Sequence, residues 1–256
     1  MFMDLEDEFG DIIQKARIGL RLSERQLAEI SGLTEEQIAE IERYSLKPED
    51  KVDILANVLK LNNRKLLNSM RKEFIPKPLE NNNDEFEVFT AVSAFPSNAY
   101  IISYKKTKEC LIIDTAGEPG VVKEKIDDNK LKPLAILLTH SHTDHIDGIK
   151  DLERVFNIKS YIFHSRLFKN ESVLPLTDNQ TLEFNNFKVK VLFTPGHTQD
   201  SCCFLIKRFC FTGDTIFAGS VGKPNWGMEV LLDSINNKIF TLSNDTVIFP
   251  GHGQGI

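Results

Sequence analysis

The spacing of apolar residues changes part-way along the chain, and this change limits the folds that the sequence can adopt. Residues 1–70 place apolar side chains at helical spacing only, whereas from Phe86 onward short runs rich in Val, Ile, Phe and Tyr alternate with helical patterns. The residues between, 71–85, contain two prolines and an Asn-rich run, which is typical of a linker. The sequence therefore predicts an all-α domain at 1–70, a linker at 71–85 and an α/β domain at 86–256.

The predicted elements of the α/β domain follow this alternation. Apolar runs rich in β-branched and aromatic residues favour strands, and longer runs with apolar residues three to four apart favour helices. We expect strands at 86–93, 98–104, 110–114, 134–138, 160–163, 187–193, 203–206, 209–212 and 246–249, and helices at 119–127, 146–156 and 228–242. Two sheets with helices outside them fit this order.

Helix start signals divide the first 70 residues. Two capping-box patterns occur, in which a hydroxyl caps the helix and an amide reaches back. The pairs are Ser23 with Gln26 and Thr34 with Gln37. Gly32 lies just before the second box, where one helix must end and the chain must turn. We therefore expect short helices at about 23–31 and 34–44 that meet across a tight turn, followed by a helix that Pro48 opens.

The composition limits the partners and the compartment. A net charge of −6 argues against non-specific attraction to nucleic acid or to an anionic membrane. The four cysteines include no C-x-x-C pair, and so few in 256 residues are typical of a reduced, cytoplasmic protein. The chain starts with an acidic segment rather than a signal peptide, and no apolar run approaches the roughly 20 residues that span a bilayer. We expect a soluble cytoplasmic protein without a membrane partner.

A histidine-rich loop follows the apolar strand predicted at 134–138. Three of the six histidines, His140, His142 and His145, lie in this loop together with Asp144. The i, i+2 spacing lets His140 and His142 point the same way from extended backbone, while Asp144 and His145 face toward a second ion. Imidazole and carboxylate ligands together suit zinc, iron or manganese.

Three further ligand candidates repeat the same context. His197, Asp214 and His252 each follow a strand end and a sharp turn that contains glycine. A single histidine is more often a satisfied surface or core residue than a metal ligand, but five histidines in such contexts favour a metal site. His164 lies outside any ligand motif, so we expect it to have a structural role.

These segments resemble the metallo-β-lactamase superfamily. The His-x-His-x-Asp-His, Pro-Gly-His, Gly-Asp-Thr and final Pro-Gly-His motifs occur in the family's order, over roughly residues 86–256. The resemblance implies a four-layer αββα sandwich that holds two divalent metal ions, with zinc favoured over iron or manganese. The implied ligands are His140, His142 and His197 for one ion, Asp144, His145 and His252 for the other, and Asp214 as the bridge. Asp114 resembles a family aspartate close behind the ligands, where an acceptor orients metal-bound imidazoles.

Within the superfamily, residues 213–224 look most similar to glyoxalase II relatives and persulfide dioxygenases. The final Pro-Gly-His favours the hydrolases, because it completes the second ligand set. The resemblance thus implies hydrolysis of a thioester by a hydroxide that two metal ions activate and that Asp144 orients. The alternative is a persulfide dioxygenase that uses one iron. Glyoxalase II continues into a helical domain that contacts glutathione, whereas this sequence ends four residues after His252, so we expect glutathione thioesters to be turned over with a weak KM.

Residues 9–60 resemble the helix-turn-helix domain of phage repressors and Cro, in which the second helix of the motif enters the major groove of DNA. In this chain the outward positions of that helix are Glu35, Glu36, Gln37 and Glu40. The basic residues offered to phosphates are Arg17, Arg21, Arg25 and Arg43. Residues 1–72 nevertheless contain 14 acidic against 12 basic side chains, whereas DNA readers are usually basic. We interpret this domain as a protein-contact or homodimerisation unit in preference to a DNA reader, with an inert solubility domain as the remaining alternative.

Three classes of function stay open at this point. The first is a hydrolase with an accessory helical domain. The second is a DNA-bound regulator whose metallo-domain senses a small thiol metabolite, and the third is a catalytically idle interaction protein. The complete ligand set argues against the third class, and the acidic second helix argues against the second.

Overall fold

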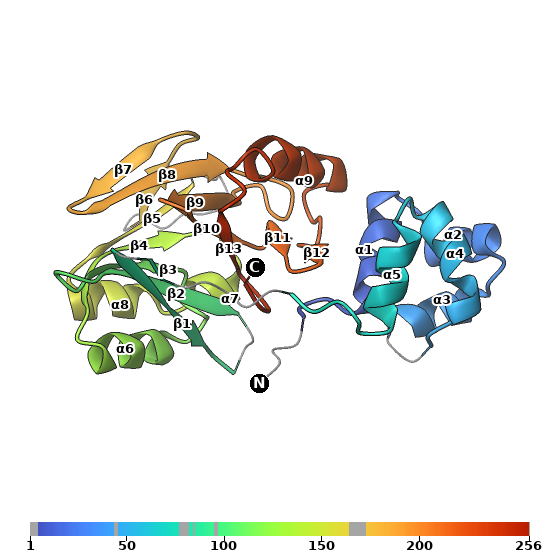
Figure 1. Ribbon diagram of the computed structural model, residues 1–256, viewed down its shortest axis with the longest axis horizontal. Helices are drawn as coiled ribbons and strands as arrows, with labels where there is room; N and C mark the ends of the chain where they lie inside the picture. Colours follow the sequence, from blue (N-terminus) through green and yellow to red (C-terminus); the bar gives the residue numbers. More distant parts are fainter. Residues whose placement is uncertain are drawn as a thin grey trace.

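The chain folds into a helical part and a larger sandwich of two sheets, as the computed structural model shows (Figure 1). The structure describes residues 5–43, 46–76, 82–83, 85–94, 97–163 and 173–255. His164, for which the sequence predicts a structural role, lies outside the described residues. No helix in these ranges is both long enough and apolar enough to cross a membrane.

Five helices form the N-terminal module, the name used here for the described residues from Phe9 to Met70. The helices are α1 (Phe9–Gly19), α2 (Glu24–Ser31), α3 (Glu35–Glu42), α4 (Val52–Val58), which a short 3-10 turn (Glu49–Lys51) precedes, and α5 (Asn63–Met70). They enclose their own apolar core, which includes Ile13, Leu27 and Leu55. The module therefore buries apolar surface independently of the sandwich.

Both predicted capping boxes are confirmed. At each one the hydroxyl accepts a hydrogen bond from the backbone N–H three residues on, and the glutamine Oε1 accepts one from the backbone N–H of the capping residue. The pairs are Ser23 with Gln26 and Thr34 with Gln37. Gly32 ends α2 in the left-handed conformation, with φ of 70°, which lets the chain turn directly into α3.

One of the arginines predicted to face DNA phosphates is instead buried. Arg17 is only 9% exposed, and its Nε and Nη2 donate to the two carboxylate oxygens of Glu42 at 2.6 and 2.7 Å. This bidentate pair joins α1 to α3 inside the module. The prediction for Arg17 was wrong because a buried carboxylate 25 residues away in the sequence takes up its guanidinium.

The first sheet of the sandwich has six strands in sequence order. They are β1 (Phe86–Val92), β2 (Asn98–Tyr104), β3 (Glu109–Ile113), β4 (Lys132–Leu138), β5 (Lys159–Phe163) and β6 (Val173–Leu176). The first three strands are antiparallel neighbours, and β3 to β6 run parallel. Parallel neighbours need crossover connections, and the helices α6 (Pro119–Asp128) and α8 (Ile149–Phe156) lie in two of them.

The second sheet has five strands in the order β13-β10-β9-β8-β7. They are β7 (Thr181–Phe184), β8 (Phe187–Phe193), β9 (Cys202–Ile206), β10 (Phe209–Gly213) and β13 (Val247–Pro250). A separate hairpin of β11 (Ile216–Phe217) and β12 (Ser220–Val221) follows β10. The helix α9 (Met228–Ser234), continued by a π-helical turn (Ile235–Ile239), precedes β13.

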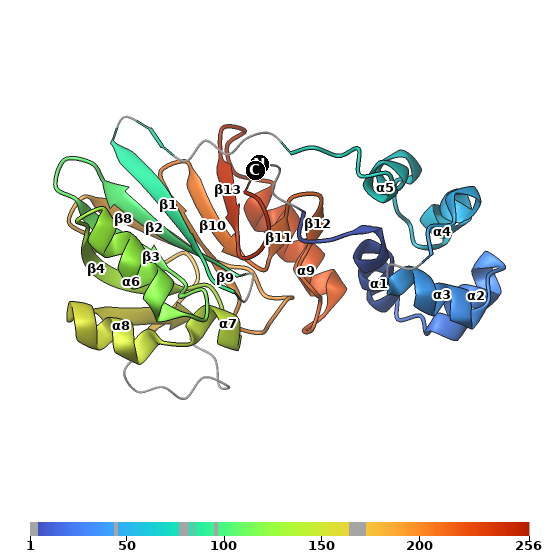
Figure 2. The ribbon, with the colours of Figure 1, turned by 90° about the horizontal axis from the view of Figure 1, so that it is seen from below.

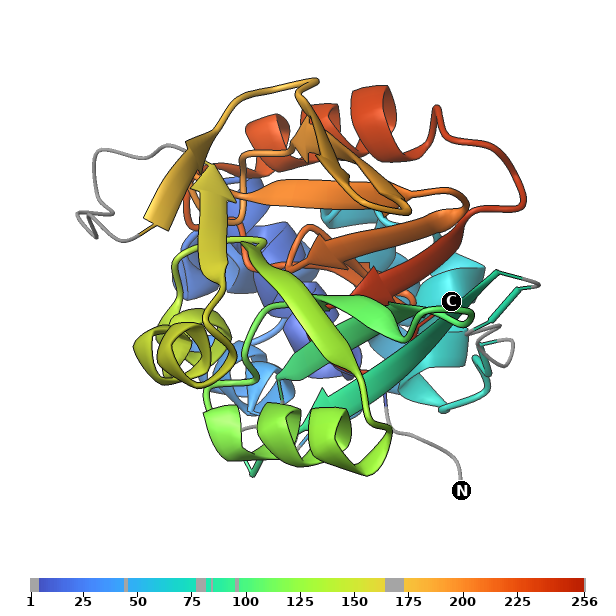
Figure 3. The ribbon, with the colours of Figure 1, turned by 90° about the vertical axis from the view of Figure 1, so that its left-hand side faces the viewer.

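Apolar side chains fill three layers between these elements. Residues such as Tyr100, Leu111 and Phe204 pack between the two sheets. A second cluster joins the outer face of the first sheet to α6 and α8, and a smaller one joins the outer face of the second sheet to the helical turn after α9. Figure 3 shows the resulting order of helices, sheet, sheet and helix, with α6 in green below and α9 in orange-red above.

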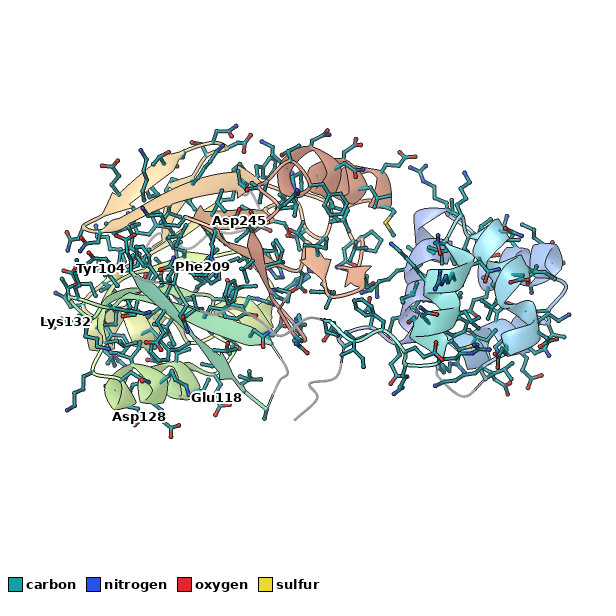
Figure 4. The ribbon with its side chains drawn as sticks, viewed as in Figure 1. Tyr104, Glu118, Asp128, Lys132, Phe209 and Asp245 are labelled. Atoms are coloured by element: carbon teal, nitrogen blue, oxygen red, sulfur yellow. The ribbon has the colours of Figure 1, made fainter. Side chains whose placement is uncertain are left out.

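The carboxyl ends of β4, β10 and β13 lie on the side of the sandwich that faces the N-terminal module (Figure 1). Lys132, at the beginning of β4, is labelled in Figure 4 at the opposite end, farthest from the module. Each of the predicted ligand loops follows a strand of the sandwich. The fold therefore brings these loops together on the side nearest the N-terminal module.

Candidate metal centre

The first group of predicted ligands surrounds His142. Its Nδ1 lies 3.1 Å from His140 Nε2 and 2.9 Å from His197 Nε2. Asp214 Oδ2 lies 3.4 Å from the same His197 nitrogen. These four side chains each offer one atom to a cluster whose members all lie within 4.8 Å of one another. Such a cluster of three imidazoles and a carboxylate has the donor types of a zinc site.

The second group consists of His145, His252 and Asp144. His252 Nε2 lies 3.3 Å from His145 Nε2 and 3.2 Å from Asp144 Oδ2. Asp214 adjoins this group as well, because its Oδ1 lies 3.4 Å from His145 Nε2 and its Oδ2 lies 3.5 Å from His252 Nε2. Asp214 thus contacts nitrogens of both groups, which is the position required of a bridging carboxylate.

Short backbone elements hold these side chains. The helical turn α7 (Thr143–Ile146) begins directly after His142 and carries Asp144 and His145. The His145 ring lies next to that of His140, with the ring centroids 4.2 Å apart. Two glycines let backbone approach the ligands: a Cβ at Gly222 would lie 3.2 Å from His197 Nδ1, and a Cβ at Gly251 would lie 2.7 Å from His145 Cε1. The glycines in these turns therefore leave room for the imidazoles.

A buried carboxylate orients the ligands from behind. Asp114 Oδ2 accepts a hydrogen bond of 2.9 Å from His145 Nδ1, which confirms the expectation for this residue. Thr139 donates to Asp114 through its backbone N–H at 2.8 Å and its hydroxyl at 2.7 Å. The Thr139 hydroxyl also lies 3.1 Å from His140 Nδ1. Sequence reasoning did not single out Thr139, although its position directly before the histidine-rich loop was a usable signal.

The carboxylates set the protonation of the second group. Burial alone would lower the pKa of His145, but Asp214 and Asp114 outweigh it and raise the pKa to about 9. A hydrogen bond with His252 lowers the pKa of Asp144 to about 2. Without a metal ion, the raised pKa therefore favours a proton on His145 near neutral pH.

The residues of this centre fit divalent metal ions. Asp214 Oδ1 is buried and accepts no hydrogen bond from the part of the chain that the structure describes, although His145 Nε2 lies 3.4 Å away. An ionised oxygen without such a donor is costly to bury unless a cation meets it. The imidazole and carboxylate donors match the preferences of zinc, iron and manganese.

Comparison with known families agrees with this geometry. The sequence model of the Metallo-beta-lactamase superfamily matches residues 92–252, which is more than half of the chain. The chain belongs to this superfamily. The α/β sandwich described above is therefore a metallo-β-lactamase fold, and all seven predicted ligands fall within the matched residues.

Two curated relatives illustrate the similarity. A probable polyketide biosynthesis zinc-dependent hydrolase of Bacillus subtilis is 28% identical over 173 residues, which cover 65% of this chain and 77% of that protein. The hydroxyacylglutathione hydrolase of Buchnera aphidicola is 36% identical over 166 residues, which cover 64% of this chain and 65% of that enzyme. The match thus spans just under two thirds of the length of the hydroxyacylglutathione hydrolase.

Two solved structures share the fold. The BLEG-1 B3 metallo-beta-lactamase superposes with a TM-score of 0.59 at 29% identity and covers 66% of this chain and 93% of that chain. The protein TTHA1623, in a di-iron-bound form, gives a TM-score of 0.56 at 26% identity with the same shares of coverage. Both similarities concern about two thirds of the present chain, so they leave the remaining third without a counterpart.

Proposed function

We propose that the protein is a metal-dependent hydrolase of thioesters, similar in its chemistry to glyoxalase II. The observation that carries this proposal is the position of Asp214 between two groups of imidazole and carboxylate ligands. Relatives named as hydroxyacylglutathione hydrolases support the choice of thioesters, and the di-iron-bound structure supports the choice of two metal ions.

Two divalent ions, with zinc favoured, would take all seven side chains as ligands. The residues proposed for one ion are His140, His142 and His197, those for the other are Asp144, His145 and His252, and Asp214 is the proposed bridge. When bound, such a pair lowers the pKa of water and stabilises negative charge on a carbonyl oxygen.

Asp144 is the proposed catalytic residue. Its low pKa keeps the carboxylate ionised near neutral pH, so that it accepts a hydrogen bond and can orient an attacking water molecule. It is also the most exposed of the carboxylates in the centre, with 36% of its side chain accessible. The side chain is thus open to a substrate that approaches from solvent.

A protein nucleophile is not part of the proposed reaction. Ser201, Cys202 and Cys203 all lie buried, in β9 or directly before it, so none of them is exposed to a substrate. The thiolate of a thioester leaves readily, so attack by water completes the hydrolysis. Asp144 therefore acts as an acceptor and orienting group and forms no covalent intermediate.

A panel of acyl-glutathione, acyl-coenzyme A and simple thioesters tests this proposal on the zinc-loaded full chain. We expect turnover of at least one class, and a loss of about 10²-fold or more in Asp144→Asn. Asp147→Asn is a matched control, because this exposed aspartate ends the same helical turn. Cleavage of a β-lactam or a phosphodiester without any thioester turnover would contradict the choice of substrate. One tightly held iron with oxygen uptake on a persulfide would favour the dioxygenase alternative instead.

We further propose the division into a helix-turn-helix domain at 1–70, a linker at 71–85 and a catalytic domain at 86–256. The left-handed turn at Gly32 between two capped helices supports the helix-turn-helix assignment. The separate apolar core of the N-terminal module supports the boundary. Circular dichroism and cooperative thermal unfolding of expressed residues 1–70 would test whether this part folds as a separate helical domain.

A further inference from the structure

The segment that leads into α1 lies against the sandwich next to the metal centre. This segment, called here the N-terminal segment, comprises residues 5–8 and has no regular secondary structure. In Figure 2 the dark blue chain passes beside β11, β12 and β13 before it enters α1. The segment that precedes the N-terminal module is thus in contact with the proposed catalytic part of the chain, and the contact lies where the ligand loops meet.

Two charged residues, Asp7 and Lys15, hold the N-terminal segment against the sandwich. Asp7 is only 6% exposed, and it accepts hydrogen bonds from Lys15 at 2.8 Å and from the hydroxyl of Ser220. Lys15 also donates to the carbonyl oxygen of Val221 at 2.7 Å. Buried charges that are paired and hydrogen-bonded on several sides hold a defined geometry. The N-terminal segment therefore has a specific position on the β11–β12 hairpin, which follows the proposed bridging ligand Asp214 in the sequence.

In this position Glu6 lies beside His252, one of the proposed metal ligands. Glu6 Oε2 lies 4.0 Å from His252 Nδ1, and 31% of the Glu6 side chain is exposed. The backbones of Glu6 and Gly253 also approach each other closely, because a Cβ at Gly253 would lie 2.9 Å from the backbone nitrogen of Glu6. Gly253 has φ of 68°, so this turn suits glycine twice over.

Other histidines that direct Nε2 to the centre have a hydrogen-bond acceptor at Nδ1. His145 Nδ1 donates to Asp114, and His197 Nδ1 donates to the carbonyl oxygen of Lys223 at 2.8 Å. Metal-bound imidazoles usually donate their second N–H to such an acceptor, which fixes the ring and raises its basicity. His252 offers Nε2 to the centre, and its Nδ1 faces Glu6.

We propose that Glu6 is a positioning residue for His252, so that the segment preceding the N-terminal module supplies part of the second metal site. The inference rests on the proposed metal centre. Glu6 accepts the Nδ1–H of His252 once the ring binds a metal ion through Nε2, and the anchor of Asp7 and Lys15 keeps the carboxylate within reach. The metallo-β-lactamase fold alone, without the N-terminal segment, would lack the Glu6 carboxylate.

Zinc affinity of the full chain tests the proposal, with zinc itself as the probe. The protein is stripped of metal and titrated against a chromophoric chelator, and the two sites are fitted separately. We expect Glu6→Gln and Glu6→Ala to weaken one site by about 10-fold or more and to leave the other unchanged. Glu8→Gln is the matched control from the same segment, because Glu8 pairs with the exposed Lys72 and faces no ligand. Equal affinities of the Glu6 variants and the wild type would overturn the inference.

Double variants show whether Glu6 acts through His252. In a His252→Ala background, Glu6→Gln should cause no further loss of zinc affinity, since the ring that it positions is absent. In a His142→Ala background, which leaves the second site, the same change should still weaken zinc binding by about 10-fold. An equal loss in both backgrounds would mean that Glu6 acts on the fold in general and would overturn the positioning role.

The wild-type titration separates this inference from the proposed function. Failure of the wild type to bind two ions would contradict the proposed centre itself. Two bound ions with no effect of Glu6 would contradict only the positioning role. Thermal unfolding of each metal-free variant identifies any that fails to fold, and Glu6→Gln, which keeps the size of the side chain, is then the decisive variant.

Discussion

At the scale of single residues, the two oxygens of Asp214 decide how the centre can work. One oxygen faces His145, and the other faces His197 and His252. A carboxylate shared in this way couples the two proposed ions, because loss of either one changes the charge that the other meets. The four motifs in the sequence placed all these residues in advance, since each motif fixes a ligand just after a strand end.

The first prediction concerns a ligand and a histidine outside the ligand motifs. His142→Ala should abolish metal occupancy at one site and lower turnover by several orders of magnitude, because His142 Nδ1 stands between two other ligand nitrogens. His164→Ala should leave activity nearly intact. Elemental analysis and turnover of both variants check this. Survival of the His142 variant together with loss of the His164 variant would contradict the assignment of ligands.

The second prediction concerns pH. The raised pKa of His145, about 9, means that this imidazole binds a proton below that pH when no metal ion is present. A metal ion must displace this proton, so zinc affinity should rise as the pH increases and should level off above about 9. Calorimetric titration near pH 7 in two buffers of different ionisation enthalpy should detect proton release. A zinc affinity that stays constant between pH 6 and pH 9 would speak against it.

At the scale of elements, the strands that the sequence did not reveal lie at sheet edges. Among the missed strands are β6, which contains Pro175, and β7, which has four residues and alternates between exposed and half-buried positions. The other two are β11 and β12, which have two residues each and form a separate two-stranded sheet. Proline is tolerated in an edge strand because no neighbour needs its missing N–H. Such short strands bury too little apolar surface to give a clear pattern. The longer buried strands were predicted to within about two residues at each end.

The third prediction concerns α3 and DNA. Glu35, Glu36 and Glu40 are exposed on this helix, as expected from the sequence, while Gln37 is half-buried and caps the helix. Carboxylates on this face repel phosphates, so residues 1–72 should bind duplex DNA no better than about 10⁻⁵ M near physiological salt. Replacement of the three glutamates by Gln should strengthen the binding and steepen its salt dependence. Fluorescence anisotropy at several salt concentrations measures both effects.

The buried pair of Arg17 and Glu42 makes that expectation stronger, because one basic residue assigned to phosphates is not available. The opposite result is easily recognised. Nanomolar binding of the wild type to one sequence, weakened by Gln37→Ala, would identify the module as a DNA reader and would support the regulator hypothesis.

At the scale of the whole molecule, the contact between the two parts could not be predicted. Asp7 and Ser220 are 213 residues apart, and no motif or periodicity relates them. Helix periodicity and strand motifs report on local structure, whereas this contact depends on how two separately packed cores meet. The sequence accordingly predicted an all-helical part and an α/β metallo-β-lactamase fold. It contained no signal for the contact of Glu6 with His252.

The fourth prediction concerns metal removal. Zinc at 100 times its dissociation constant should stabilise the folded chain by about 2.7 kcal/mol for each site, because the unfolded chain lacks the assembled ligands. A chelator in excess should reverse this and lower the Tm by several degrees. Scanning calorimetry with and without zinc measures the change. An unchanged Tm would show that the native fold does not hold the metal.

The burial of all four cysteines has a consequence for how the protein meets small thiols and disulfides. They lie in β3, β9 and β10, and burial raises the pKa of Cys110 to about 12. Exchange with a disulfide requires a thiolate that the reagent can reach. The proposed thioesterase reaction releases a thiol at each turnover, and oxidation of that product would give a disulfide able to react with accessible cysteines. Because these four sulfurs are buried inside the sandwich, we expect that they do not exchange with disulfides while the chain is folded.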